Sequence, residues 1–335
     1  MGVVELLSGY FLTTKSQTNY RRQASERFAP FADDRVVVLF RKMQDGEFNF
    51  DSVPAALLRL TAPPSLAWRR GHQVSVPQGV ANASEWNDFA AALRKFSRVA
   101  RFQEFFRSNA ALYRDLANRV DPLVVPNVDA LQDYVGSSLG RWQVIVSPLM
   151  HDGGFATRYD TGREPETYAL IGPLAAVNGQ PDFGDEPRLQ RLIVHEFAHS
   201  LINPLAAADP SEVSQYAGRF NAIRKRMEKH GYGDWTTVVN EHVVRAVTAR
   251  VVGLRHGEEA GRRAVAEEAA AGFCYVPALV ERLRLYEHDR RKWPTLQSFY
   301  RELLRGFGEE AVVARGDMDA AQNPGPCRGQ VRRPG

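Results

Sequence analysis

Apolar residues recur every three or four positions over most of the first 140 residues, which is the period of a helix with one buried face. The longest such stretch begins near Ser84 and carries a stripe of large apolar side chains: Trp86, Phe89, Leu93, Phe96, Val99, Phe102, Phe105 and Phe106. We interpret the stripe as core packing rather than a ligand groove. Residues 36–39 fit either a strand or a buried helix, and Pro122 and Pro126 predict a turn.

The pattern changes near residue 141, where short alternating segments replace the helical period. Residues 142–147, 155–159 and 167–171 have the composition and alternation of strands. A helix follows at about residues 188–201 and is expected to end at Asn203-Pro204, with Asn203 capping that end. The last of these strands precedes this helix, and we expect it to be an edge strand that can pair with an extended peptide.

After residue 209 the pattern is helical again, with breaks near residues 231–233 and 272. This order predicts an α+β fold that is mostly helical, with a small antiparallel sheet before the helix at 188–201. We expect a helical region at residues 1–140 and a second region at 141–310, joined in one continuous compact unit. Residues 316–335 are rich in Gly, Pro and Arg and predict a flexible tail.

The composition excludes several classes of protein. With 44% hydrophobic and 24% charged residues, the 335-residue chain has an ordinary globular composition. Cys274 and Cys327 are too few for a disulfide framework or a Cys-rich zinc module, and Cys274 is expected to be a small core residue. No apolar stretch approaches the roughly 18 residues that span a bilayer.

Charge and the first residues say little about partners or location. The net charge of +4 is spread along the chain, and no nucleic-acid docking motif accompanies it, so we expect no nucleic-acid partner. The apolar start is interrupted by Glu5 and lacks preceding basic residues and a cleavage site, which argues against a signal peptide. We therefore expect a cytoplasmic protein, or an exported one if the N-terminus was trimmed.

The segment His195-Glu196-Phe197-Ala198-His199 carries the strongest chemical signal. On a helix, residues four apart share one face, so both imidazoles can bind one zinc ion, and Glu196 can take a proton from the attacking water. Chance predicts about 0.01 such matches in a chain of this composition. Between residues 192 and 202 Glu196 is the only acidic or basic residue other than histidine, which indicates a buried helix whose ionisable groups need compensation.

A catalytic zinc site requires a third protein ligand and an open coordination position. We favour Glu241, because it lies in a second largely apolar helix and Arg245, four residues later, can hold its carboxylate. A Glu241–Arg245 ion pair without metal remains an alternative, as does His242 as the ligand. The other downstream candidates are His230, Asp234, Glu258 and Glu259.

These residues resemble the gluzincin arrangement, in which a helix glutamate supplies the third zinc ligand. The chain more closely resembles an uncharacterised, largely bacterial family of proposed zinc metallopeptidases, catalogued as a domain of unknown function. The resemblance lies in residues 4–7 (VELL), the HEFAHS core at 195–200, Asn203-Pro204, and the pair Glu241 and Arg245, and it spans about residues 3–305. It implies one zinc per chain bound by His195, His199 and Glu241, with Glu196 as base, and it supplies no substrate.

The residue that stabilises the transition state is less well marked. Tyr275 is our candidate, with His230 and Tyr232 as others. The sequence predicts a zinc-dependent metallopeptidase acting on peptide or protein substrates. A non-catalytic zinc-binding or interaction protein is the alternative, and the presence of Glu196 argues against it because a structural site needs no base. A DNA-binding protein is the third and weakest hypothesis.

Overall fold

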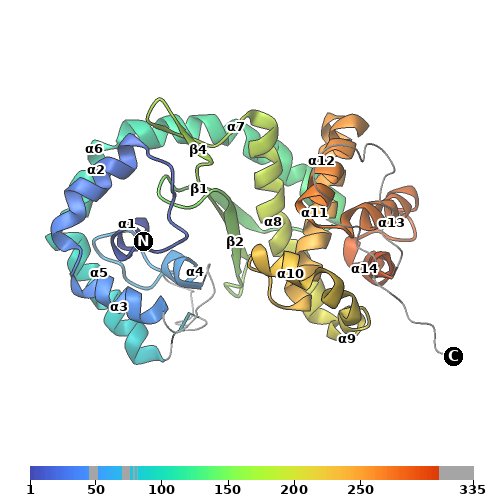
Figure 1. Ribbon diagram of the computed structural model, residues 1–335, viewed down its shortest axis with the longest axis horizontal. Coiled ribbons are helices and arrows are strands. Elements are labelled where there is room, and N and C mark those ends of the chain that lie inside the picture. Colours follow the sequence, from blue (N-terminus) through green and yellow to red (C-terminus); the bar gives the residue numbers. More distant parts are fainter. Residues whose placement is uncertain (45–51, 70–75, 78–79, 81, 309–335) are drawn as a thin grey trace. The chain divides into compact units, whose positions relative to one another are not determined.

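The computed structural model describes residues 1–44, 52–69, 76–77, 80 and 82–308 (Figure 1). They are mostly helical with two small sheets, which confirms the α+β class. None of the described helices combines the length and hydropathy needed to cross a bilayer. The predicted tail at 316–335 lies outside the described residues.

Contacts divide the chain into two compact units. Unit 1 comprises Met1–Pro126 and Leu139–Glu196, and unit 2 comprises Asn127–Ser138 and the residues from Phe197 onward. The boundary between Glu196 and Phe197 lies inside a helix of the region 141–310, which we predicted from the sequence to be one region. Unit 1 begins with α1 Gly2–Ser8, α2 Asn19–Phe28, η1 Ala29–Phe31, α3 Arg35–Gln44, α4 Ser52–Leu58, α5 Ala83–Val99, α6 Phe102–Ser108 and the first part of α7 Ala110–Val135.

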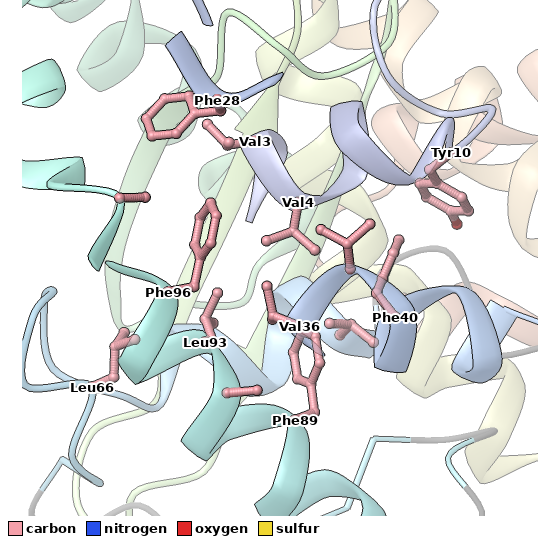
Figure 2. Close-up of a cluster of buried hydrophobic side chains, with 14 of the residues drawn as sticks. Val3, Val4, Tyr10, Phe28, Val36, Phe40, Leu66, Phe89, Leu93 and Phe96 are labelled. Atoms are coloured by element: carbon pink, nitrogen blue, oxygen red, sulfur yellow. The ribbon is translucent and has the colours of Figure 1, made fainter. Parts of the chain in front are cut away.

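The helical part of unit 1 encloses an apolar core (Figure 2). Residues 36–39 belong to helix α3 and not to a strand, because Val36, Val37 and Phe40 are buried at helical spacing while Val38 is half exposed. Most of the predicted stripe is core packing, with Phe89 fully buried, but its members Val99 and Phe106 are exposed. The stripe is divided at residue 101, whose left-handed backbone ends one helix and begins α6.

Phe89 supplies a stability prediction for unit 1. Replacing Phe89 by Ala should destabilise unit 1 by about 3–5 kcal/mol, because it removes a fully buried ring stacked on Trp86 at 5.6 Å between centroids. Val99→Ala on the same helix is the matched control, since Val99 is 56% exposed. Urea unfolding followed by tryptophan fluorescence measures both. Equal midpoints for the two variants would contradict the packing of this core.

Unit 1 also contains the sheets, with β1 Arg141–Val146, β2 Gly154–Tyr159, β3 Glu166–Ile171, β4 Ala175–Val177 and β5 Gln180–Asp182. In the three-stranded sheet β3 is central, parallel to β1 and antiparallel to β2, whereas β4 and β5 form a separate antiparallel pair. The expectation that the strand at 167–171 is an edge strand was wrong. β3 has a strand on each of its edges and all six of its residues are buried, and β2 is an edge strand instead.

Two predicted helix ends are corrected. α7 runs through both Pro122 and Pro126, and α8 (Glu186–Ala208) continues past Pro204. A proline inside a helix removes one hydrogen bond and crowds the carbonyl four residues earlier, but it does not remove the apolar face. Buried residues on both sides of the prolines keep that face packed: Val120, Val124, Val128 and Leu131 in α7, and Ile202 and Ala206 in α8.

Unit 2 is built around α11, a helix that is buried along most of its length. Its close contact with α12 depends on Gly253 and Gly261, since a Cβ on Gly261 would lie 2.9 Å from the Gly253 Cα. The remaining elements are the C-terminal part of α8, α9 Pro210–Ser214, η2 Ala217–Arg219, α10 Phe220–Lys229, α11 Trp235–His256, α12 Glu258–Ala271, α13 Val276–His288, α14 Leu296–Leu304 and η3 Arg305–Phe307.

Candidate metal centre

Helix α8 carries both histidines of the motif. His195 and His199 are one turn apart on the same face and are half-buried, while Phe197 and Ala198 between them are fully buried. The apolar face of the helix therefore packs in the core, and the face that carries the two imidazoles is directed toward polar side chains that include Glu241. The helical spacing predicted from sequence is therefore present.

Asn203 orients the His199 ring. The His199 Nδ1 lies 3.3 Å from the Asn203 Oδ1, and this contact is a hydrogen bond in the tautomer in which Nδ1 carries the proton. The other ring nitrogen, Nε2, is then left with its lone pair, and it lies 3.5 Å from the Glu241 Oε1. Asn203 therefore holds the tautomer that a metal ligand requires, and it does not act as the helix-end cap that we expected.

Glu241 lies on α11, whose first turn is capped by the Asp234 side chain. Glu241 is buried, with 7% of its surface exposed. The Arg245 Nη2 lies 3.2 Å from the Glu241 Oε2, and the Arg245 Nη1 lies 2.7 Å from the Glu268 Oε2. The guanidinium also stacks over the Phe273 ring, 3.8 Å from its centroid. Arg245 thus holds one carboxylate oxygen of Glu241, and the other faces His199.

Tyr232 adds a third group to this arrangement. Its hydroxyl is hydrogen-bonded with both Glu241 and Arg245. Burial and the Glu241 charge raise the pKa of this hydroxyl well above its usual value, so it stays protonated and donates to the carboxylate. Tyr232, which the sequence marked only as a secondary candidate, therefore contacts the proposed third ligand.

His195, His199 and Glu241 lie close enough to hold one metal ion. One possible ligand atom from each lies within 4.8 Å of the other two. Two ligands bound to tetrahedral zinc at 2.0–2.1 Å lie about 3.3 Å apart. The 3.5 Å separation of the His199 Nε2 and the Glu241 Oε1 is near that value. The third ligand chosen from sequence is thus beside the histidine pair.

Glu196 is 4% exposed and lies against the edge strand β2. A Cβ built on Gly154 would be 2.7 Å from both the Cγ and the Cδ of Glu196. The glycine therefore provides the space that this side chain occupies, and it places β2 directly beside the candidate base.

Residues 8–306 match a family described as a domain of unknown function, DUF4932. The chain belongs to this family. No curated protein and no solved structure matches it. The DUF4932 assignment supplies no activity, substrate or metal.

Several alternative ligands of this DUF4932 protein have other partners. The His230 Nε2 lies 3.0 Å from the Ala271 carbonyl, and Asp234 caps α11. Glu258 pairs with Arg250 and Arg284, and Glu259 pairs with Arg262. These contacts leave Glu241 as the downstream carboxylate that joins the histidines in the described part of the chain.

His242 faces a different part of the helix from its neighbour Glu241. It is fully buried, with Nδ1 2.7 Å from the Val238 carbonyl and the ring packed against Phe273, Tyr275 and Phe307. Burial lowers its pKa to about 4, so it is neutral. Tyr275 belongs to this aromatic cluster, and its catalytic role stays a prediction. Cys274 is half-buried.

Sequence reasoning missed three contributors to the DUF4932 site. Asn203 follows His199 by four residues, so the same helical spacing that identified the histidines also marked it as a neighbour. Glu268, the second partner of Arg245, lies on another helix and had no local signal. Gly154 precedes the predicted strand at 155–159, and its missing side chain makes room for Glu196, a contact between distant residues that has no local signal.

Proposed function

We propose that this chain is a zinc-dependent metallopeptidase. The observation that carries the proposal is the convergence of His195, His199 and Glu241, with the buried Glu196 carboxylate next to the first ligand in sequence. Two imidazole nitrogens and one carboxylate oxygen are a donor set typical of catalytic zinc, and three protein ligands leave one coordination position open.

The geometry around Glu241 favours a metal over a simple ion pair. Arg245 binds Oε2, while Oε1 faces the His199 Nε2, which carries a lone pair when Nδ1 donates to Asn203. Two such atoms 3.5 Å apart need a proton or a cation between them, and a metal ion meets that need while both ligands stay deprotonated. A zinc ion would supply that cation, and the Arg245–Glu268 pair is neutral by itself, so it adds no net charge to the site.

In this proposal Glu196 moves the protons. The Glu196 carboxylate accepts a proton from the attacking water as its oxygen bonds to the peptide carbonyl carbon, and it delivers that proton to the leaving amine as the C–N bond breaks. When bound, zinc supplies Lewis-acid polarisation and stabilises the charge that develops on oxygen. Burial of Glu196 keeps bulk water from competing for the proton.

The edge strand β2 is the proposed docking site for the peptide backbone. Among the strands that the structure describes it pairs with β3 alone, and its first residue, Gly154, abuts Glu196. An extended peptide that adds to the other side of β2 would bring its backbone past the base. This replaces the strand at 167–171 in our original expectation, because that strand is central.

Metal analysis combined with a peptide-library digest tests the proposal. We expect one zinc per chain and chelator-sensitive cleavage of internal peptide bonds. Zinc without cleavage would favour the alternative of a non-catalytic zinc-binding protein. A chain that binds no zinc would contradict both.

Gly154→Ala tests the space beside Glu196. The added methyl group would overlap Glu196 and the Leu170 carbonyl oxygen, 2.6 Å from the ideal Cβ position, so the carboxylate must move. We expect kcat to fall about 100-fold, because displacement of a catalytic group by a fraction of an ångström is enough to disturb proton transfer. Gly218→Ala is the control for the loss of a glycine, since no atom lies within 4 Å of its ideal Cβ position and its backbone is not left-handed. Unchanged kcat in the first variant would contradict this placement.

Asn203→Ala tests the orientation of His199. Removing the Oδ1 acceptor frees the imidazole tautomer, and we expect zinc affinity to fall about 10–100-fold. Competition with a fluorescent zinc chelator measures the affinity directly. Asn221→Ala is the matched control, because this asparagine lies on α10 and bonds the exposed Arg224. Equal zinc affinities in both variants would show that Asn203 does not support the ligand.

A further inference from the structure

One face of the three-stranded sheet in unit 1 borders a cavity of about 680 Å³, which we call the sheet cavity. Its floor includes two cross-strand pairs, Gln143 with Tyr168 and Ile145 with Leu170. Helices α1, α4 and α5 and the segment 60–69 complete the wall. Val3, Val4, Leu93 and Phe96, drawn in Figure 2, lie along it.

The sheet cavity is separate from the carboxylate of Glu196. Side chains alternate between the two faces of a strand, so Ile171 points away from the cavity when Leu170 lines it. Gly154 is the cross-strand partner of Ile171, so both face the side of the sheet that is away from the cavity. Glu196 lies against Gly154 on that side. The cavity therefore lies across the sheet from the proposed base.

The size and lining of the sheet cavity are those of a binding site. A single deleted core side chain leaves a hole of about 150 Å³, so this space is several times larger than a packing defect. Its volume falls within the roughly 300–1,000 Å³ of small-molecule sites. Most of the lining is aliphatic or aromatic, which gives water few hydrogen-bond partners and favours an apolar occupant.

The charges at the wall are already neutralised. Among the lining residues that the structure describes, the charged groups are the Arg69 guanidinium and the Met1 α-amino group, and the buried Met1 group is balanced by the Glu5 carboxylate. The Arg69 Nη1 donates to the Tyr168 hydroxyl at 2.7 Å and to the Leu58 carbonyl at 3.2 Å, and its Nη2 lies 3.0 Å from the Glu166 carboxylate. An ionised ligand would therefore lose its hydration without gaining an unpaired opposite charge.

Two neutral polar groups remain for a ligand. Gln143 on β1 and Ser147, which directly follows β1, line the cavity; Gln143 is exposed and Ser147 half-buried, and neither side chain hydrogen-bonds within the described ranges. The other two hydroxyl groups of serine and threonine there are used, since Ser97 donates to the Arg94 carbonyl and Thr61 accepts from the Ala67 N–H. We propose that the sheet cavity binds an uncharged aliphatic molecule whose hydroxyl or amide group bonds Gln143 or Ser147.

Binding of a neutral fluorescent probe, N-phenyl-1-naphthylamine, to the full chain tests this site. We expect the probe fluorescence to rise and saturate. At neutral pH, 1-dodecanol should displace the probe at an at least about tenfold lower concentration than dodecanoate, because the carboxylate must lose its hydration to enter the cavity. Ser97→Leu, which fills the cavity from α5, should weaken probe binding about tenfold. Val99→Leu, on the exposed side of α5, is the matched control and should leave it unchanged.

Ile145→Trp fills the same space from the sheet, and it keeps the test decisive if Ser97→Leu fails to fold. Circular dichroism verifies that each variant is folded. Absence of saturable probe binding, or binding that survives both filled variants, would overturn the site. Equal displacement by dodecanoate would overturn the assignment of an uncharged ligand. The assay needs neither zinc nor hydrolysis, so its result is independent of the proposed function.

Discussion

Glu196→Gln should abolish hydrolysis while leaving one zinc bound per chain. Glutamine keeps the size and shape of the side chain, so it fits the space beside Gly154, but it has no carboxylate to accept a proton. Loss of a positioned general base lowers kcat by about 10²–10⁴-fold, and we expect the upper end because Glu196 serves both proton transfers. That loss corresponds to about 5 kcal/mol of transition-state stabilisation.

The measurement is kcat on a peptide identified in the library digest, with zinc content determined on the same sample. Glu186→Gln is the matched control, since Glu186 lies at the exposed start of the same helix and bonds Gln190. Wild-type turnover in the Glu196 variant would refute its assignment as base. Loss of zinc together with activity would show that the carboxylate supports the metal rather than the proton transfer.

Glu241→Gln has the second large expected effect, on zinc binding itself. The substitution removes the negative ligand and leaves a weaker neutral oxygen, so zinc affinity should fall by more than the roughly 10–100-fold of an outer-shell change. The metal-free chain should also lose about 1–3 kcal/mol of stability, because the buried Arg245 loses one of its two carboxylate partners.

Zinc competition and urea unfolding of the metal-free chain measure these two effects separately. Glu258→Gln is the control, since Glu258 also pairs with arginines but lies outside the metal cluster. A stability loss in Glu241→Gln with wild-type zinc affinity would support the ion-pair alternative. Wild-type zinc affinity together with wild-type stability would show that Glu241 is neither a zinc ligand nor a stabilising partner of Arg245.

Local geometry explains which parts of the site were predictable. The spacing of His195 and His199 brings two imidazoles together on any α-helix, so their proximity follows from backbone periodicity alone. The choice of Glu241 rested on a carboxylate in an apolar helix with an arginine four residues later, and the Arg245 contact has that spacing. Both inferences needed only neighbours within one or two turns.

Helix ends were less predictable. Pro122, Pro126 and Pro204 all lie inside helices, because the cost of a missing hydrogen bond is smaller than the gain from packing residues on both sides. That gain depends on elements that are distant in sequence. For the same reason Asn203 was interpreted as a cap, although it lies within a continuing helix and bonds His199.

The sequence by itself determined the α+β class, the histidine pair with its adjacent glutamate, and the favoured third ligand, because each depends on the period of a helix or strand. Tertiary structure decided that β3 is central and β2 an edge, that Gly154 makes room for Glu196, and that Glu268 braces Arg245. It also created the sheet cavity. The physical reason is that these contacts join residues far apart in the chain, whose meeting is set by the packing of whole elements rather than by local backbone geometry.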